Sequence, residues 1–366
     1  PVPAIRARRG PVARRRREPA VTALTSQPDS QGRAATEPLL RTERLTRHFK
    51  IGNALSRRIL HAVDDVSFAI GERQIVAVAG ESGSGKSTIA RLLAKVYRPT
   101  SGEIYFQGTP LSAITSRKDR LRYSGLAPMV FQDPFASINP VFRVSHGVMR
   151  GMKLHRPELT ADQRYAEALR VFDVVGLTPA AEVLQRYPHE LSGGQRQRVG
   201  FAQALAMRPK LILADEPVSM LDVSIRIGLL NLMAKLRDEE GVSILYITHD
   251  LASARYVADR LIVMYAGQIA ESGPAEDVLA SPRHPYTQLL LSAVPDPRAP
   301  LNVTAETGQG EPPRVIDPTP GCRFRWRCPL AIDECHQVTP ALRELLPDHS
   351  AACHVARADA VTEAFR

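Results

Sequence analysis

Short apolar runs occur along this chain, separated by helix-prone segments. Val63–Ile70 alternates between apolar and polar positions, which predicts a strand with one buried face. Gln74–Ala79 is apolar after its first residue and is followed by Gly80, a pattern typical of a buried parallel strand. Two further apolar runs, Leu211–Ala214 and Ile244–Thr248, predict strands of the same kind. Strands that alternate with helices predict an α/β fold.

The pattern changes at three places along the chain. Residues 1–40 mix Arg, Pro, Ala and Ser without apolar periodicity and predict a disordered basic tail. Residues 41–294 carry the α/β pattern, and a polar, helix-prone stretch at about 111–190 predicts a helical insertion into it. After about residue 295 the chain is rich in Pro and contains every cysteine, so we expect residues 295–366 to form a C-terminal extension.

The charge of the chain is concentrated at one end. The formal net charge is +10, and seven arginines lie within the first 17 residues. Such a tail suits a solvated segment, or one that contacts anionic lipid or nucleic acid. No apolar run reaches the length of about 18 residues that a membrane-spanning helix needs, so a membrane role would have to come through partners.

The segment Gly80–Thr88 fits the phosphate-binding pattern G-x-x-x-x-G-K-[ST] and directly follows a predicted strand. Glycines at these positions let backbone N–H groups approach phosphates closely. We expect Lys86 to reach the β- and γ-phosphates and the Ser87 hydroxyl to bind Mg²⁺. The whole segment is predicted to bind ATP: Gly80, Glu81, Ser82, Gly83, Ser84, Gly85, Lys86, Ser87 and Thr88.

A second candidate feature is the pair of carboxylates that ends the predicted strand Leu211–Ala214. In a doubly wound sheet the carboxyl end of such a strand lies beside the phosphate loop. We therefore expect Asp215 to hold Mg²⁺, directly or through water, and Glu216 to act as the general base that polarises the attacking water.

The run Leu191–Arg198, which reads LSGGQRQR, lies between the phosphate loop and the acidic strand. Ser192, Gly193 and Gly194 are predicted to open a helix whose free N–H groups and positive dipole end suit an anion. With these motifs in this order, residues of about 40–275 resemble the ATP-binding cassette ATPases. That resemblance implies a P-loop NTPase cassette with a RecA-like core, an antiparallel β subdomain and a helical insertion.

The resemblance also implies how ATP is held. In the cassette family two subunits enclose ATP, and the signature run of one subunit meets the γ-phosphate held by the other. Ser192, Gly193, Gly194 and Gln195 match that run. Asp222 ends the segment Ser219–Asp222, which resembles the family's D-loop except for Met220 in place of the usual Ala. We expect these residues to contribute to ATP binding across a dimer interface.

Three further site residues follow from the same resemblance. His249, at the end of Ile244–Thr248, matches the switch histidine that orders the catalytic water. Gln132 matches the glutamine that senses Mg²⁺ and that water. Phe49 is assigned as a loop-placed ring that stacks on adenine, with a core Phe as the competing interpretation and His48 or Tyr97 as less suitable rings.

Three stretches narrow the resemblance to the ATPases of oligopeptide and dipeptide importers: Phe131–Pro140, Ser281–Pro295 and Gly321–Leu330. That group implies two integral membrane permeases as partners and an external solute-binding protein that acts indirectly. It implies a peripheral location at the cytoplasmic face of the membrane. It also favours a heterodimer with a second ATPase subunit over a homodimer, and no specific nucleic-acid partner is expected.

All four cysteines lie in the expected extension, with the spacing C-x5-C-x6-C-x17-C: Cys322, Cys328, Cys335 and Cys353. Four thiolates suit a zinc ion or an iron–sulfur cluster. Zinc is disfavoured because the close C-x2-C pairs of structural zinc sites do not occur, and similar extensions in peptide-importer ATPases favour a [4Fe–4S] cluster. Unliganded thiols, disulfides and a mixed ligand set with His336 or His354 stay open.

Two functions are compatible with these motifs. The first is the ATP-hydrolysing subunit of a membrane importer, with di- or oligopeptides as the expected cargo. The alternative is a soluble cassette ATPase acting on nucleic acid or ribosomes, in which the arginine-rich tail would bind phosphates. The chain has a single cassette and no heptad run, and its C-terminal stretch resembles importers, so the first function is favoured.

Overall fold

The computed structural model describes residues 37–52, 58–133, 138–293, 315–359 and 364. The predicted tail therefore lies outside the described residues as far as residue 36. From Glu37 onward the described chain forms one compact unit. Leu39 and Leu40 are already buried, and the first strand begins at Leu40. Among the described residues no helix is both long and apolar enough to cross a bilayer.

A four-stranded antiparallel sheet forms the first layer, with the strand order β2-β1-β4-β5. Its strands are β1 (Leu40–Ile51), β2 (Arg58–Ile70), β4 (Ser101–Phe106) and β5 (Thr109–Pro110). The predicted strand Val63–Ile70 is the second half of β2. Leu40 pairs with Ile70 and His48 with His61, so the two strands run alongside each other over almost their whole length.

The second sheet has eight strands in the order β11-β12-β10-β9-β3-β8-β7-β6. Strands β9, β3, β8, β7 and β6 are parallel, and β10, β12 and β11 add antiparallel strands at one edge. The bounds are β3 (Ile75–Ala79), β6 (Met129–Val130), β7 (Leu211–Asp215), β8 (Ser243–Thr248), β9 (Arg260–Tyr265), β10 (Gln268–Pro274), β11 (Arg343–Leu346) and β12 (His349–Ala351).

Burial explains why β3, β7 and β8 are the most apolar strands. Every residue of these three strands is buried. Successive side chains of a strand point to opposite faces. Accordingly, Ile75, Ala77 and Ala79 join one hydrophobic cluster, while Val76 and Val78 join the other. The predicted apolar runs are thus the central strands of a sheet covered on both faces, which confirms the α/β fold.

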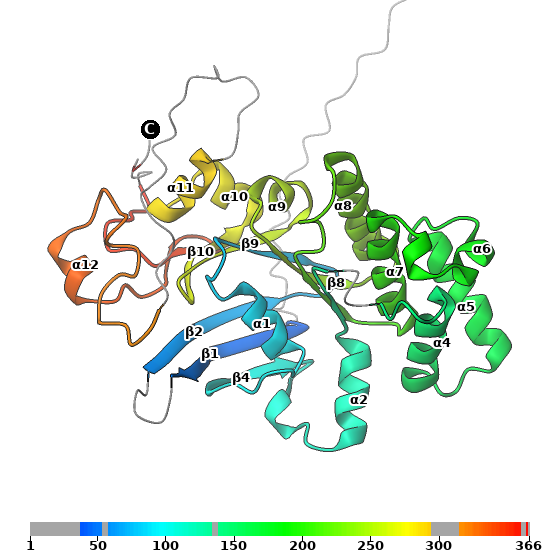
Figure 1. Cartoon of the computed structure of the whole chain (residues 1–366). Coiled ribbons are helices and arrows are strands. Elements are labelled where there is room, and N and C mark those ends of the chain that lie inside the picture. Colours follow the sequence, from blue (N-terminus) through cyan, green and yellow to red (C-terminus); the bar gives the residue numbers. More distant parts are fainter. Residues whose placement is uncertain (1–36, 53–57, 134–137, 294–314, 360–363, 365–366) are drawn as a thin grey trace, which may run out of the picture. The chain divides into compact units, whose positions relative to one another are not determined.

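The helices divide between the two faces and the two ends of this sheet. Figure 1 shows α4–α7 gathered beyond the β6 end and α12 beyond the other end. Their bounds are α1 (Lys86–Leu93), α2 (Arg117–Leu126), α4 (Val144–His155), α5 (Ala161–Val174), α6 (Ala180–Gln185), α7 (Gly193–Ala206), α8 (Val223–Asp238), α9 (Leu251–Val257), α10 (Ala275–Ala280), α11 (Pro285–Ser292) and α12 (Asp333–Gln337).

The stretch predicted as a helical insertion is not uniformly helical. It begins with the short 3-10 helix η1 (Leu111–Ala113) and α2, and β6 then pairs with β7 inside the core sheet. Helices α4–α6 follow, and the 3-10 turn η2 (Pro188–Glu190) leads into α7. Short apolar strands such as β6 carry too few residues for their periodicity to be recognised.

The C-terminal extension joins the core instead of standing apart from it. Strand β12 pairs with β10, with Glu271 opposite Ala351. Val315, Cys322, Phe324 and Cys335 belong to the same hydrophobic cluster as β3 and β8. This arrangement brings the cysteine-containing segment close to the elements that form the nucleotide site.

Candidate functional site

Four polar segments meet at the carboxyl edge of the parallel sheet. Gly80 follows β3, Gln132 follows β6, Glu216 follows β7 and His249 follows β8. Because these strands are parallel neighbours, their carboxyl ends lie at the same edge, and this edge is where α/β sheets bind ligands. Gln132, Glu216 and His249 line a cavity of about 1120 Å³, together with Lys86, other residues of the loop after Gly80 and part of β1 and β2.

The phosphate loop connects β3 to α1 and depends on glycine at two close approaches. Gly80 has φ +150° and Gly85 has φ +103°. A Cβ at Gly80 would lie 2.2 Å from the carbonyl oxygen of Met264, and one at Gly85 would lie 2.2 Å from that of Ala62. A larger residue at either position would therefore displace the backbone that forms the loop.

Lys86 begins α1 and is almost completely buried, with 4% of its surface exposed. Its Nζ donates hydrogen bonds to the carbonyl oxygens of Gly80 at 2.7 Å and Glu81 at 2.8 Å. Burial lowers the pKa of Lys86, while the charges of Glu216, Asp215 and Glu81 act in the opposite direction. The ammonium group is thus held inside the loop, where an entering phosphate would meet it.

Ser87 and Asp215 join α1 to β7. The Ser87 hydroxyl donates a hydrogen bond of 2.8 Å to Asp215 Oδ1. Burial raises the pKa of Asp215, and the Ser87 hydrogen bond opposes that shift. A hydroxyl and a carboxylate on facing elements offer the hard oxygen ligands that Mg²⁺ prefers, so this pair fits the ion.

Gln132, Glu216 and His249 converge on a single carboxylate oxygen. Gln132 Nε2 donates to Glu216 Oε2 at 3.1 Å, and His249 Nδ1 lies 3.2 Å from the same oxygen. Glu216 also has a positive φ of 45°, a backbone conformation that costs energy in a residue with a side chain. Strain and shared hydrogen bonding at one side chain are typical of a catalytic group.

The position of Phe49 in the structure differs from the loop position that the sequence predicted. It lies in β1, not in a loop, and it is half-buried instead of being part of the core. Its ring lines the cavity, with the Arg47 guanidinium 4.4 Å from its centre and Tyr97 edge-on at 5.3 Å. Tyr97 lines the cavity as well, so the structure offers two aromatic rings beside the phosphate loop.

Sequence reasoning missed two residues of the C-terminal extension that line the cavity, Val315 and Ile316. The Val315 carbonyl accepts a hydrogen bond of 2.8 Å from the His61 N–H, and Ile316 forms a β-bridge with Leu60. A short apolar pair in a Pro-rich stretch carries no periodicity, so no local signal identified these residues.

The signature run lies away from this cavity. Ser192 is the N-cap of α7, and its side chain accepts from the Gln195 N–H in a complete capping box. Asp222 precedes α8 and is exposed. Neither Ser192–Gln195 nor Asp222 is among the described residues that line the cavity. A nucleotide bound to the phosphate loop of this chain would therefore not contact its own signature run.

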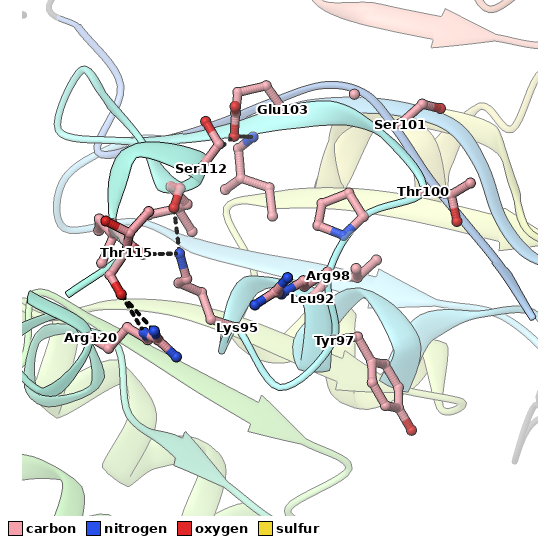
Figure 2. Close-up of a pocket in the computed structure, with 15 residues that line it drawn as sticks. Leu92, Lys95, Tyr97, Arg98, Thr100, Ser101, Glu103, Ser112, Thr115 and Arg120 are labelled. Atoms are coloured by element: carbon pink, nitrogen blue, oxygen red, sulfur yellow. Dashed lines mark hydrogen bonds between the residues drawn. The ribbon is translucent and has the colours of Figure 1, made fainter. Parts of the chain in front are cut away.

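A second cavity of about 430 Å³ lies between the end of α1, β4 and α2. Figure 2 shows Lys95 and Arg120 at its wall. Lys95 donates to the carbonyl oxygens of Leu111 and Ile114, and Arg120 donates to that of Thr115. Both cations already have backbone partners, and the phosphate loop does not reach this cavity, so it does not resemble a nucleotide site.

The four cysteines come together from different parts of the extension, and none is in a disulfide. Cys335 lies in α12, and its carbonyl accepts a hydrogen bond of 2.8 Å from the Cys322 N–H. The pKa of Cys322 is raised to about 11 and that of Cys328 to about 12, mainly by burial and also by the charges of the neighbouring thiols. The cysteines therefore share one partly buried site.

The cysteine geometry does not match a single zinc ion. Tetrahedral zinc with Zn–S bonds of about 2.3 Å places its sulfurs about 3.8 Å apart. Among the described residues, no three cysteine sulfurs lie within 4.8 Å of one another. An iron–sulfur cube places sulfides and irons between the thiolates, so its cysteines stand farther apart than around a single ion. The four thiols offer soft sulfur donors that either group could use, and the described residues show no set of three close enough to hold a single ion.

The fold and the site define a class of protein. A parallel sheet holds a G-x-x-x-x-G-K-[ST] loop, a Ser–Asp pair that suits Mg²⁺, and a carboxylate near a Gln and a His. Those parts position a nucleoside triphosphate, its metal ion and a water molecule. The protein is therefore a P-loop nucleoside triphosphatase.

Comparison with known proteins narrows this class. The family described as ABC transporter matches residues 63–219, and the C-terminal region of the oligopeptide/dipeptide transporter family matches residues 270–335. A putative peptide import ATP-binding protein of Brucella ovis is 42% identical over 316 residues, which cover 86% of this chain and 97% of that protein. The oligopeptide transport ATP-binding protein AppF of Bacillus subtilis is 40% identical over 327 residues, which cover 88% and 98%.

Solved structures agree with these relatives. The dimeric structure of MJ0796, a bacterial ABC transporter cassette, gives a TM-score of 0.58 at 28% identity and covers 64% of this chain and 98% of that chain. This chain belongs to the ATP-binding cassette family of transporter ATPases. It is an ATPase whose substrate is ATP and whose metal cofactor is Mg²⁺, and the predicted cassette fold is confirmed.

Proposed function

We propose that this chain is the ATP-hydrolysing subunit of an importer for di- or oligopeptides. The observation that carries the proposal is the combination of a cassette with the C-terminal region of the oligopeptide/dipeptide transporter family. Relatives that share about two-fifths of its residues over most of its length are named as peptide and oligopeptide import ATPases. The division into residues 1–40, residues 41–294 with an insertion at about 111–190, and residues 295–366 is also part of this proposal.

Within the site we assign roles by chemistry and distance. The phosphate loop holds the triphosphate through its backbone N–H groups, and Lys86 balances the charge on the β- and γ-phosphates. Ser87, Asp215 and Gln132 supply oxygen atoms for Mg²⁺, which neutralises charge that develops on the phosphates. Phe49 contributes an aromatic face for adenine.

Hydrolysis is assigned to the three side chains that meet beside the loop. Glu216 accepts a proton from the attacking water, because its carboxylate is placed at the end of β7 next to Lys86. His249 and Gln132 hold that carboxylate between them at 3.2 and 3.1 Å, and they restrict the position of the water. The transferred γ-phosphate passes to water, so ADP and phosphate are the products.

Completion of the site is assigned to a second subunit. The N-terminus of α7 presents free N–H groups and a positive dipole end, which suit the γ-phosphate of the partner's ATP. Ser192, Gly193, Gly194, Gln195 and Asp222 thus act in trans. The similar cassette MJ0796 is dimeric in solved structures, which supports this arrangement. We further propose that the second subunit is a different ATPase chain.

The permease contact is assigned to the surface at α4. A cavity of about 480 Å³ is lined there by Ile138, Asn139, Phe142 and His146, among others. Phe142, which lines this cavity, is 44% exposed and the adjacent Val141 is 73% exposed, so apolar side chains are accessible beside it. Part of the expected groove, residues 134–137, lies outside the described residues. The remainder suits an amphipathic helix of a permease.

The same proposal places the chain at the cytoplasmic face of the membrane as a peripheral subunit. Two integral permeases form the pathway, and an external solute-binding protein delivers the peptide. The nucleic-acid alternative has no support from the relatives and structures described above. The arginine-rich tail, on which that alternative mainly depended, lies outside the described residues.

For the cysteines we propose a [4Fe–4S] cluster on Cys322, Cys328, Cys335 and Cys353, in preference to Zn²⁺. When bound, such a cluster would cross-link three segments of the extension through its iron–thiolate bonds. Anaerobic purification with iron, sulfide and zinc assays tests this on the wild type, on Cys328→Ser and on Arg325→Ala as a control from the same segment. We expect iron and sulfide to fall in Cys328→Ser alone. Colourless wild-type protein without either metal would contradict the cluster.

The importer function is tested by mild detergent extraction of the tagged chain from native membranes, followed by mass spectrometry of the co-purifying proteins. We expect two polytopic permeases and a second, different cassette chain. The matched control is a Phe142→Asp variant, which places a charge on the proposed permease groove and should lose the permeases but keep ATP binding. Recovery of the wild type without membrane proteins, with ribosomes or nucleic acid attached, would overturn the proposal.

A further inference from the structure

The cysteine segment carries two arginines that the ATPase mechanism does not use. Arg323 directly follows Cys322, and Arg327 directly precedes Cys328. Their side chains are 11% and 9% exposed, so both cations are largely withdrawn from water. A buried cation needs a partner, and each of these arginines finds an acidic one in the cassette.

Arg327 binds the phosphate loop itself. Its two terminal nitrogens donate to Glu81 Oε2 at 2.7 Å and Oε1 at 2.9 Å, in the parallel two-bond geometry that guanidinium and carboxylate favour. Glu81 is the second residue of the loop, and its carbonyl oxygen is one of the two acceptors for Lys86 Nζ. Arg327 therefore contacts Glu81, and Glu81 in turn contacts Lys86, the lysine that balances the phosphate charge.

The packing around Arg327 fixes its position. Phe324, in the same segment, is buried against Tyr265 and Tyr286, with ring centres 5.2 and 5.5 Å away. The Arg327 guanidinium lies 5.8 Å from the ring centres of both Tyr265 and Phe324. Tyr286 also accepts a hydrogen bond of 2.8 Å from the Glu81 N–H. Residues after β9 thus hold both the backbone and the side chain of Glu81.

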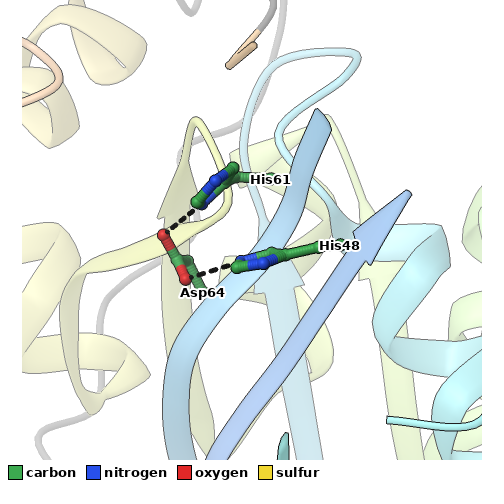
Figure 3. Close-up of side chains that lie close together, drawn as sticks. All are labelled: His48, His61 and Asp64. Carbon is green, nitrogen blue, oxygen red and sulfur yellow. Dashed lines mark hydrogen bonds and ion pairs between the residues drawn. The ribbon is translucent and has the colours of Figure 1, made fainter. Parts of the chain in front are cut away.

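Arg323 anchors the other end of the segment. It donates to the Ala266 carbonyl and to Asp64 Oδ2. Figure 3 shows that Asp64 is also shared by His48 and His61, whose ring nitrogens lie 3.0 Å from its two oxygens. These three donor groups have the spacing of a metal site, but the Arg323 guanidinium already balances the Asp64 charge. The trio is therefore an anchor for Arg323.

From these contacts we propose that Arg327 is a positioning residue for ATP: it neutralises and orients Glu81, and so links the four-cysteine segment to the phosphate loop. The proposal rests on the ATPase function given above and not on the peptide cargo. Without Arg327, the Glu81 carboxylate would remain in the loop that holds the triphosphate as an unbalanced negative charge. At an effective dielectric constant of about 20, one such charge several ångströms away weakens anion binding about tenfold or more.

The test measures equilibrium binding of ATP to the purified full chain by calorimetry, with Mg²⁺ present and a non-hydrolysable ATP analogue in place of ATP. We expect Arg327→Ala to raise the Kd for ATP about tenfold or more, and Arg327→Lys to raise it less. In steady state, KM for ATP should rise by a similar factor while kcat changes less than about twofold. Arg325→Ala is the matched control, because Arg325 bonds to Cys322 and Thr319 of its own segment and should leave binding unchanged.

A charge rescue separates positioning from a general loss of stability. In the Arg327→Ala background, Glu81→Gln should recover most of the lost affinity, since the amide no longer repels the phosphates. A purely structural role of Arg327 would show no such recovery, and that result would overturn the proposal. Unchanged ATP binding by Arg327→Ala, next to a wild type that binds ATP, would also overturn it. A wild type that bound no ATP would instead contradict the ATPase function.

The link to the cysteines is tested by a double-mutant cycle. Because Arg327 and Cys328 are adjacent, displacement of Cys328 should release Glu81 as well. We expect Cys328→Ser to raise the Kd for ATP in the wild-type background and to have little further effect in Arg327→Ala. Fully additive effects would show that the cysteine segment does not act through Arg327, and would overturn that part of the proposal.

Discussion

Glu216 shows how one side chain can be held between two others for a chemical step. Its carboxylate is reached by Gln132 from the end of β6 and by His249 from the end of β8. Its own backbone has a positive φ and donates to the Ile247 carbonyl at 3.0 Å. The neighbouring strands therefore stabilise a conformation that the residue would avoid by itself.

At this scale we expect Glu216→Gln to retain ATP binding and to reduce hydrolysis by about two to four orders of magnitude, because only the proton acceptor is lost. Single-turnover hydrolysis and ATP binding are measured on the same preparation. Glu276→Gln serves as a control that makes the same change from carboxylate to amide at an exposed residue of α10, outside the cavity. Normal turnover by the Glu216→Gln variant would remove Glu216 from the role of base.

The local residues of the phosphate loop could be predicted because the pattern is contiguous. Gly80 and Gly85 are required by close backbone approaches, and the motif contains both. The convergence of Gln132 with Glu216 and His249 could not be derived from spacing, since it depends on β6, β7 and β8 being neighbours. Only the resemblance to a known family suggested it.

At the scale of elements, the first turn of helix α7 contains both a stabilising cap and the backbone N–H groups proposed to bind phosphate. Ser192 accepts from the Gln195 N–H, and Gln195 Oε1 accepts from the Ser192 N–H at 3.0 Å. This capping box satisfies two backbone donors and leaves the remaining N–H groups of the first turn without helical partners. The helix is therefore stable and still able to bind an anion supplied by another subunit.

We expect Ser192→Arg to abolish cooperative hydrolysis while the isolated chain still binds ATP, because the added side chain blocks the partner's phosphate. Loss of the cap alone costs about 1 kcal/mol. Ser116→Arg removes the corresponding cap from α2, where Ser116 accepts from the Asp119 N–H, and so controls for stability and charge. Equal loss of ATP binding by the Ser192→Arg variant as a monomer would argue against a signature that acts in trans.

At the scale of the whole described chain, a buried carboxylate joins the cassette to its extension. Glu271 in β10 accepts hydrogen bonds from the N–H groups of Arg283 at 2.6 Å and His284 at 3.0 Å. His349 Nε2, in β12, lies 2.7 Å from the same carboxylate. His284 Nδ1 in turn accepts from the Tyr286 N–H at 3.0 Å and so caps α11. Three elements thus meet at one buried polar cluster.

This cluster makes stability depend on pH. Burial lowers the pKa of His284 to about 4, with the charge of Glu271 opposing that shift. The unfolded state, with a pKa of about 6.5, then binds more protons than the folded state below that pH. His284 therefore contributes full stability above about pH 6.5, and this contribution falls by up to about 3 kcal/mol as pH decreases toward 4.

Urea unfolding between about pH 5 and 7.5 measures this loss. His284→Asn keeps a side-chain oxygen that can cap α11 but no longer titrates, so its stability should change less steeply with pH than that of the wild type. The exposed His189, changed to Asn, is the matched control and should keep the wild-type slope. Identical slopes for all three proteins would exclude His284 as the source.

Features that lie within short segments could be predicted from the residues alone. The apolar runs became β3, β7 and β8, the phosphate loop and the helix start at Ser192 formed as predicted, and the motifs identified the ATPase. Phe49 shows the limit of this reasoning, because its strand depends on pairing with residues of β2. Local pattern is sufficient where the physical requirement itself is local.

What distant segments do together depended on the folded arrangement. Strand order placed Glu216 between Gln132 and His249, and the pairing of β12 with β10 brought the cysteine segment to the phosphate loop. The contact of Arg327 with Glu81 joins residues that stand 246 positions apart. No periodicity or motif encodes such a separation. The contact between Arg327 and Glu81 results from the packing of Phe324 and the extension against the central sheet, whose other strands come from earlier parts of the chain.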